Sequence, residues 1–437
     1  MSACPQRVLQ MHTTHSPSFL VLHQNVGLWN ASNSGKSVII GVFDTGIAPQ
    51  HPSFNDNGMP SPPVKWKGRC EFNVRTYCNK KLIGARNFTQ QDKSPWDKNG
   101  HGTHTSSTAA ENFVGGANFL EADVVAGLDA AIDDGVDVIS MSFGLVVSPP
   151  LYDDYVAVES DILPTTNVGY SDGQMIINYT KSTSTPVATI LFKGMRTGNK
   201  NAPTVAYFSS RGPFMQSRGI LKPDIIGPGV NNLAAWTTPV GGAITSATAV
   251  SLTFNILSGT SMSCLHLARD ETLKHADLLT LGSGHVNPSR AYDPGLIYDI
   301  QPEDYIPYLC GLNYTDNQVS AIVKKKVHCP SGIPRSELNY PSFYIPKESS
   351  AQTYTRTVTN VGEAIAAYRV KVFGLKGVEV TINPKKLKFT ALNQKASHNV
   401  TVVSSNLIGH SQGYLTWSSH RHSVRSPIEV FPHINVI

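Results

Sequence analysis

The sequence is poor in charged residues and has no long apolar run. Asp, Glu, Lys and Arg make up 15% of the 437 residues, and the net charge at pH 7 is +5. No basic run is long enough to predict a nucleic-acid or membrane surface. No apolar stretch approaches the ~18 residues that cross a bilayer, and residues 1–10 lack the apolar segment of a signal peptide. We therefore expect a mildly basic globular protein without a nucleic-acid or membrane partner.

Two further absences exclude two classes of enzyme. Asp44-Thr45-Gly46 is a signature of aspartic proteases, but these need a second such motif to supply the paired carboxylate, and the chain has none. His101 and His104 are close in sequence, yet neither a His-Glu-x-x-His pattern nor a marked third ligand accompanies them. We expect neither a metal nor another cofactor.

What the sequence does contain is a serine at the start of a predicted helix. Ser261 follows Gly259-Thr260, and its simplest interpretation is a helix N-cap. A serine hydroxyl becomes a nucleophile only when a base takes its proton and a third group orients that base. Upstream, an apolar run ends at Asp44, which could also be a turn residue, and His101 lies among glycines. The chain therefore offers a carboxylate, an imidazole and a hydroxyl, in that order.

The order Asp44, His101, Ser261 is that of the subtilisin group. The chain resembles plant subtilisin-like serine proteases of the cucumisin-like group through motifs at residues 42–47, 101–105, 208–213 and 259–263. The resemblance implies a serine endopeptidase acting on protein or peptide substrates. In it Asp44 orients His101, His101 acts as general base, Ser261 attacks, and His104 supports the helix.

The resemblance also implies the fold. We expect an α/β catalytic domain with a parallel sheet flanked by helices, interrupted by a protease-associated insert and followed by an all-β fibronectin III-like sandwich. The expected segments are catalytic residues 1–155, an insert remnant at 156–200, catalytic residues 201–310, a linker at 311–337 and the sandwich at 338–437. Short strands are predicted in the sandwich at residues 353–359, 368–372, 378–382, 387–389, 400–403 and 413–417. This part should be the most stable by itself.

Substrate and oxyanion groups follow from the same resemblance. Residues 121–134 have helical spacing, and residues 136–143 alternate as a strand. Ser140, Ser142 and Gly144 are expected to pair with an extended substrate, although an ordinary core strand is the simpler interpretation. The Ser261 backbone N–H is the expected oxyanion donor. The family's Ala-Gly-Asn motif, whose Asn side chain is the second donor, is missing, and such a loss lowers turnover ~100- to 1000-fold.

Other internal segments of the family pattern are missing too. Residues 117–121 leave little room for a further strand, and the helix after Ser261 becomes polar within two turns. Because displacing a catalytic group by ~1 Å can lower the reaction rate ~100-fold, several such losses together are expected to lower or abolish turnover. A second hypothesis stays open: a catalytically dead pseudoprotease or truncated gene product that acts, if at all, as a peptide- or protein-binding module.

Cysteines and sequons bear on localisation. Cys70 with Cys78, and Cys310 with Cys329, are candidate disulfides whose connectivity the spacing does not determine. Residues 51–54 and 65–88 are expected to be surface loops around the first pair. Five glycosylation sequons begin at Asn30, Asn87, Asn178, Asn313 and Asn399. With the resemblance, these features predict an extracellular, apoplastic protein, although the expected signal peptide and inhibitory propeptide are not recognised in the sequence.

Overall fold

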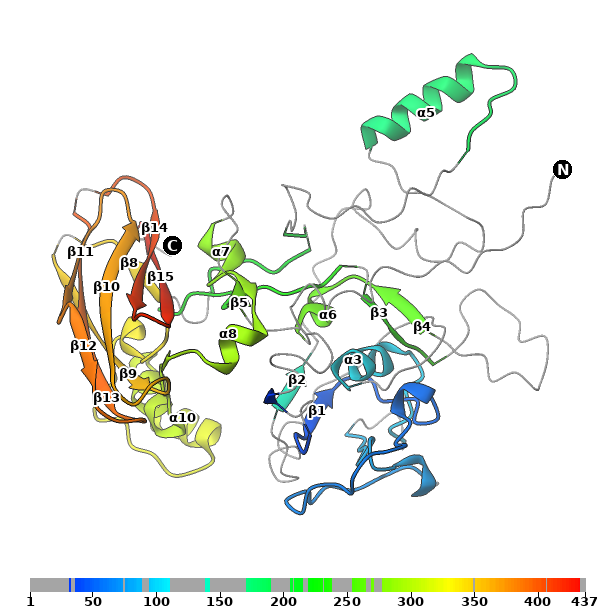
Figure 1. Cartoon of the computed structure of the whole chain (residues 1–437), viewed down its shortest axis with the longest axis horizontal. Helices are drawn as coiled ribbons and strands as arrows, with labels where there is room; N and C mark the ends of the chain where they lie inside the picture. Colours follow the sequence, from blue (N-terminus) through cyan, green and yellow to red (C-terminus); the bar gives the residue numbers. More distant parts are fainter. Residues whose placement is uncertain are drawn as a thin grey trace. The chain divides into compact units, whose positions relative to one another are not determined.

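The structure is a computed structural model, shown in Figure 1, in which the chain forms two compact units. The first unit consists mainly of the described residues within 36–189 and 229–264, and the second of those within 205–228 and 269–432. None of the helices described is both long and apolar enough to cross a membrane. The structure describes residues 31–32, 36–73, 75–88, 94–110, 138–141, 170–189, 205–206, 208–214, 219–230, 232–237, 254–264, 269–270, 277–348, 350–405 and 407–432.

The first unit contains a pair of parallel strands. Strand β1 (Ile40–Phe43) pairs with β2 (Val138–Met141), so that Val42 lies opposite Ser140. Strand β2 falls inside the segment predicted as a strand, residues 136–143, and β1 lies in the apolar run that ends at Asp44. Asp44 follows β1 directly, at the carboxyl end of the strand, which is where parallel α/β sheets present functional groups.

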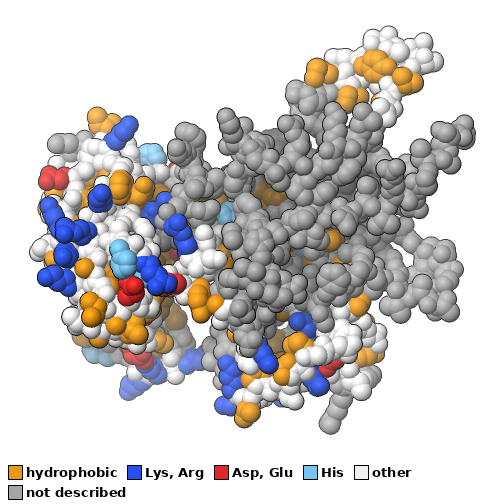
Figure 2. All heavy atoms as spheres, in the orientation of Figure 1, with side chains coloured by type: hydrophobic (Ala, Val, Ile, Leu, Met, Phe, Trp, Pro, Cys, Tyr) orange, Lys and Arg blue, Asp and Glu red, His pale blue; other side chains and the backbone are white. Residues whose placement is uncertain are grey.

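Helix α3 (His101–Ala110) packs on β1 and on an antiparallel hairpin formed by β3 (Asn232–Ala235) and β4 (Phe254–Leu257). The short helix α6 (Thr260–Cys264) follows β4 and lies against α3 and β2. The first unit also contains α5 (Tyr170–Ser182), which exposes several apolar side chains (Figure 2).

Parts of the two segments expected to be surface loops, residues 51–54 and 65–88, form a small buried core instead. The prediction is wrong for those parts. Ser53, Phe54 and Phe72 are buried, in or next to two short 3-10 helices, η3 (Pro52–Phe54) and η4 (Arg75–Tyr77). The reason is aromatic packing, since Phe72, Tyr77 and Trp96 contact one another edge to face. Cys70 and Cys78 form a disulfide beside this cluster.

The second unit contains the β-sandwich. Its sheets have the orders β12-β10-β14-β15-β8 and β11-β13-β9-β7. The bounds are β7 (Leu296–Ile297), β8 (Phe343–Pro346), β9 (Gln352–Asn360), β10 (Ala366–Gly374), β11 (Glu379–Asn383), β12 (Lys386–Phe389), β13 (Lys395–Val403), β14 (Ser411–Ser418) and β15 (Ser423–Phe431). All six predicted strands are confirmed. The three missed strands are short, or, in β15, interrupted by Pro427, which weakens the pattern of a central strand.

Side chains from both sheets form one apolar core that includes Phe343, Val358, Tyr368 and Trp417. The remaining elements of this unit lie before β8 in sequence, some of them before β7 and some after it, and a disulfide links Cys310 to Cys329. These elements are β5 (Arg269–Asp270), α7 (Leu278–Leu281), β6 (His285–Val286), α8 (Pro288–Tyr292), η7 (Pro302–Asp304), α9 (Tyr305–Gly311), α10 (Asp316–Val323) and η8 (Arg335–Glu337).

Candidate active site

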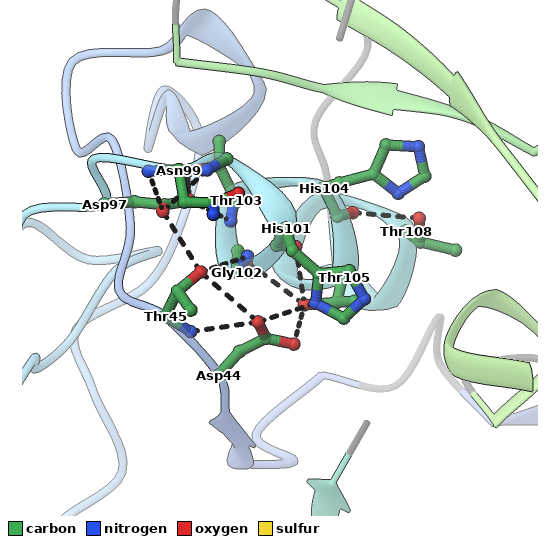
Figure 3. A network of polar contacts seen from close by, with 11 residues as sticks. Asp44, Thr45, Asp97, Asn99, His101, Gly102, Thr103, His104, Thr105 and Thr108 are labelled. Atoms are coloured by element: carbon green, nitrogen blue, oxygen red, sulfur yellow. Dashed lines mark hydrogen bonds and ion pairs between the residues drawn. The ribbon is translucent and has the colours of Figure 1, made fainter. Parts of the chain in front are cut away.

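The carboxylate and imidazole singled out in the sequence lie in contact. His101 Nδ1 is 2.7 Å from Asp44 Oδ1, and the two side chains are 3% and 2% exposed (Figure 3). The Thr45 backbone N–H donates to the same oxygen at 2.9 Å, and the Thr105 hydroxyl donates to Asp44 Oδ2 at 2.9 Å. With Asp44 held in this way, Nδ1 of His101 carries the proton that faces the carboxylate, and Nε2 is the basic nitrogen.

Two glycines explain how the segments that carry these residues approach so closely. A Cβ on Gly102 would lie 2.2 Å from the Gly46 carbonyl oxygen, and Gly46 itself has a φ of +121°. The first turn of α3 therefore packs backbone against backbone on the turn that follows β1. Only glycine permits that approach, which is the physical reason for Gly in both motifs.

Asp97 is a site residue that the sequence reasoning missed. It is fully buried and accepts hydrogen bonds from the Gly100 and Thr103 backbone N–H groups, at 2.7 and 2.8 Å. The Thr45 hydroxyl donates to it at 3.1 Å and accepts from the Gly102 N–H at 3.0 Å. The available signal was an Asp just before a helix that opens with Gly-His, which is typical of a side chain that caps a helix N-terminus.

His104 and Ser107 join α3 to the hairpin that leads to Ser261. His104 Nε2 lies 3.0 Å from the Asn232 carbonyl oxygen and 3.2 Å from that of Asn255. The Ser107 hydroxyl accepts from the Ala235 N–H at 2.7 Å. Burial lowers the pKa of His104 to about 3, so the ring is neutral and donates from Nε2 to both carbonyls. This agrees with the supporting role inferred for His104.

Ser261 lies in the first turn of α6 and is half-buried. The Gly259 N–H donates to the Gly229 carbonyl at 2.7 Å, and a Cβ on Gly229 would lie 2.8 Å from the Gly259 oxygen. Met262, which is 1% exposed, anchors the helix in the unit. Since α6 packs against α3, the serine and histidine come from neighbouring helices.

The remaining predicted site residues are only partly described. Ser140 lies in β2 and is buried, while Ser142, Gly144 and the helix predicted at 121–134 fall outside the described residues. Residues 265–268 and 271–276 of the helix expected after Ser261 fall outside them too, whereas Arg269–Asp270 form strand β5, so the helix does not continue through them. Residues 156–169, which follow the point after which the family carries the Ala-Gly-Asn motif missing from this chain, also lie outside the described residues. Within the described part of the chain, no group of three or more His, Cys, Asp or Glu residues is arranged to hold a metal ion.

Comparisons with known proteins agree with this organisation. The model of the Subtilase family matches residues 35–269, and that of the Fibronectin type-III domain matches residues 337–430. Subtilisin-like protease SBT1.2 of Arabidopsis thaliana is 30% identical over 668 aligned positions, covering 98% of this chain and 86% of the relative. Subtilisin-like protease SBT3 of Solanum lycopersicum is 28% identical over 662 positions, covering 100% and 87%.

The alignment with the Arabidopsis relative extends over 668 positions although this chain has 437 residues. It must therefore contain long gaps opposite segments of the relative that this chain lacks. Gaps of this total length are expected if internal segments of the family pattern are missing.

Proposed function

The chain belongs to the subtilase family of serine peptidases, and on that premise we propose that Asp44, His101 and Ser261 form the catalytic triad of an endopeptidase. The observation that carries the proposal is the buried contact of 2.7 Å between His101 Nδ1 and Asp44 Oδ1. A contact of this kind leaves Nε2 as the base and stabilises the imidazolium that forms during proton transfer. Ser261, on helix α6 beside α3, is the proposed nucleophile.

The reaction follows from these roles. His101 Nε2 takes the Ser261 hydroxyl proton as Oγ bonds to the carbonyl carbon of the substrate, and Asp44 holds the ring in the required tautomer. The imidazolium returns the proton to the leaving amine, so the peptide bond breaks and an acyl-enzyme remains. Water, deprotonated by the same ring, releases the acid and restores the Ser261 hydroxyl. The Ser261 backbone N–H is the proposed donor to the oxyanion.

A second candidate function is favoured by the alignment gaps. A chain that lacks segments of the catalytic domain could retain an extended-peptide surface, with β2 as the pairing strand, and bind peptides without cleaving them. The two functions differ in whether Ser261 reacts.

A fluorophosphonate serine probe applied to the folded chain tests the proposal. We expect covalent labelling of the parent and no labelling of Ser261→Ala, while Ser258→Ala, which changes an exposed serine just before α6, labels like the parent. Circular dichroism establishes that each variant is folded. Absence of labelling in a folded parent would contradict the enzyme and leave the binding function.

The two disulfides favour an oxidising compartment, because such bonds are rare in reducing cytosol. We propose that the protein works outside the cell on protein or peptide substrates. Mass spectrometry of the protein purified from its source, without reduction, should show Cys70 linked to Cys78, and free thiols at both positions would contradict this localisation.

A further inference from the structure

Asp97 is a buried carboxylate to which donors converge from two separate segments. Its Oδ1 accepts from the Asn99 N–H at 3.1 Å, the Gly100 N–H at 2.7 Å and the Thr45 hydroxyl at 3.1 Å. Its Oδ2 accepts from the N–H and hydroxyl of Thr103, at 2.8 and 2.6 Å. Both oxygens therefore accept several hydrogen bonds, which is the arrangement typical of a buried carboxylate.

The donors connect Asp97 to both of the segments whose contact defines the site. Gly100 directly precedes His101, the first residue of α3, and Thr103 follows it by two residues, so Asp97 holds the backbone that carries the imidazole. Thr45 directly follows Asp44, and its hydroxyl links Asp97 to the Gly102 N–H. The Thr103 hydroxyl also accepts from the Ala48 N–H at 3.0 Å, which adds a second tie to the same loop.

The charge of Asp97 has a separate consequence. His101 is the first residue of α3, and a helix N-terminus carries about half a positive charge, which disfavours an imidazolium there. A carboxylate bonded to the N–H groups of this same turn offsets that charge. Asp44 acts in the same direction, and His104, on α3 itself, is neutral. Among the elements that pack against α3, β1 and β3 carry no ionisable residue and α6 carries only Cys264.

We propose that Asp97 is a positioning residue for proton transfer: it fixes the His101 backbone relative to Asp44 and supplies negative charge that stabilises the protonated ring. The proposal deepens the triad assignment and rests on it. Nothing in the role requires Asp97 to touch a substrate. Its effect passes through the position and the basicity of His101.

The test titrates His101 by NMR in the full chain and, in parallel, measures the pH dependence of fluorophosphonate labelling. Asp97→Asn keeps the size of the side chain but removes its charge. We expect the pKa of His101 to fall by about one unit and labelling above that pKa to slow by about 10- to 100-fold. Asp97→Glu, which restores the charge, should return the pKa of His101 to within a few tenths of a unit of the parent value.

Two further variants separate geometry from charge. Thr45→Val removes the hydroxyl link without changing charge, so labelling should slow by about 10-fold while the pKa of His101 stays at the parent value. Asp56→Asn removes a carboxylate from the same unit, where it accepts from the Lys80 N–H, and should change neither quantity. If Asp97→Asn does not fold, the Asp97→Glu and Thr45→Val pair still tests the proposal.

An unchanged His101 titration in folded Asp97→Asn overturns the proposal, and so does a labelling rate equal to that of the parent. The proposed function fails in a different way. A folded parent that does not react with the probe contradicts the enzyme, yet the NMR titration still reports whether Asp97 sets the basicity of His101.

Discussion

The sandwich and the described part of the first unit are held together by different forces. In the sandwich, two sheets enclose one large apolar core that includes Phe343, Val358 and Trp417, each essentially inaccessible to solvent. Among the described residues of the first unit, the apolar cluster is a small one around Ile47, Phe54 and Phe72. Around the site, buried hydrogen bonds from Asp97, His104 and Ser107 join the segments instead. Apolar packing tolerates small shifts of the side chains, whereas a hydrogen bond requires a particular distance and angle between donor and acceptor.

Two buried histidines show the same contrast. His104 has two carbonyl oxygens within hydrogen-bonding distance of Nε2. His398, in the sandwich, packs edge to face on Trp417, and neither ring nitrogen has a hydrogen-bond partner. The first histidine connects segments, while the second fills space in an apolar core.

The largest predicted effect is on the sandwich. Replacing Trp417 by Ala leaves a cavity in the core, and we expect the free energy of unfolding to fall by about 3–5 kcal/mol. Hydrogen exchange of the β13 and β14 amides in the full chain measures the loss. Ile365→Ala, at an 81% exposed position in the same domain, is the control and should stay within about 0.5 kcal/mol. Equal exchange in both variants would show that the apolar core does not dominate the stability of the sandwich.

The second prediction concerns acid. Burial, aided by the charge of Arg356, lowers the pKa of His398 to about 4, whereas its value in the unfolded chain is about 6.5. Since the neutral ring is the folded form, its contribution is intact above pH 6.5 and is lost as the pH falls to 4, by about 3 kcal/mol in all. His398→Phe should remove this part of the acid sensitivity.

Chemical denaturation at pH 7 and pH 4, followed by β-sheet circular dichroism, gives the difference. His420→Phe is the matched control, since His420 is 76% exposed and its surface contact with Glu363 contributes little to stability. A parent chain whose sandwich is equally stable at both pH values would refute the assignment of His398.

The third prediction tests position in the first unit. The Cβ of Gly102→Ala would meet the Gly46 backbone, so α3 must shift and His101 must move away from Asp44. Probe labelling of Ser261 should slow by about 100-fold. Ser61→Ala, at an exposed position of the same unit, is the control and should label like the parent. Normal labelling of Gly102→Ala would mean that close packing of the two turns is not required.

The smallest predicted effect concerns the hydrogen bonds that His104 makes and His398 lacks. His104→Phe fills the same space but donates to neither the Asn232 nor the Asn255 carbonyl, and we expect a loss of about 1–3 kcal/mol in the first unit. His104→Gln keeps an N–H donor and should recover part of it. Thermal unfolding monitored by exchange of the β3 and β4 amides provides the readout. If His104→Phe is as stable as the parent, the His104 side chain contributes only packing and its hydrogen bonds to the two carbonyls add no stability.

The sequence by itself indicated the residues that we propose carry the chemistry and the family to which the chain belongs. Asp44, His101 and Ser261 were identified from short motifs, because each motif is local and its order along the chain is informative. The six predicted strands of the sandwich followed from alternation and turn residues, which are also local.

Only the tertiary structure decided how the parts of the site are joined. Asp97 bonds to Thr45 across 52 residues, and His104 to Asn255 across 151, so no local pattern reveals either partner. The burial of Phe72, expected in a surface loop, likewise depends on Trp96, a residue distant in sequence. Local patterns record what each segment prefers, whereas burial and long-range hydrogen bonds exist only once the chain has brought those segments together.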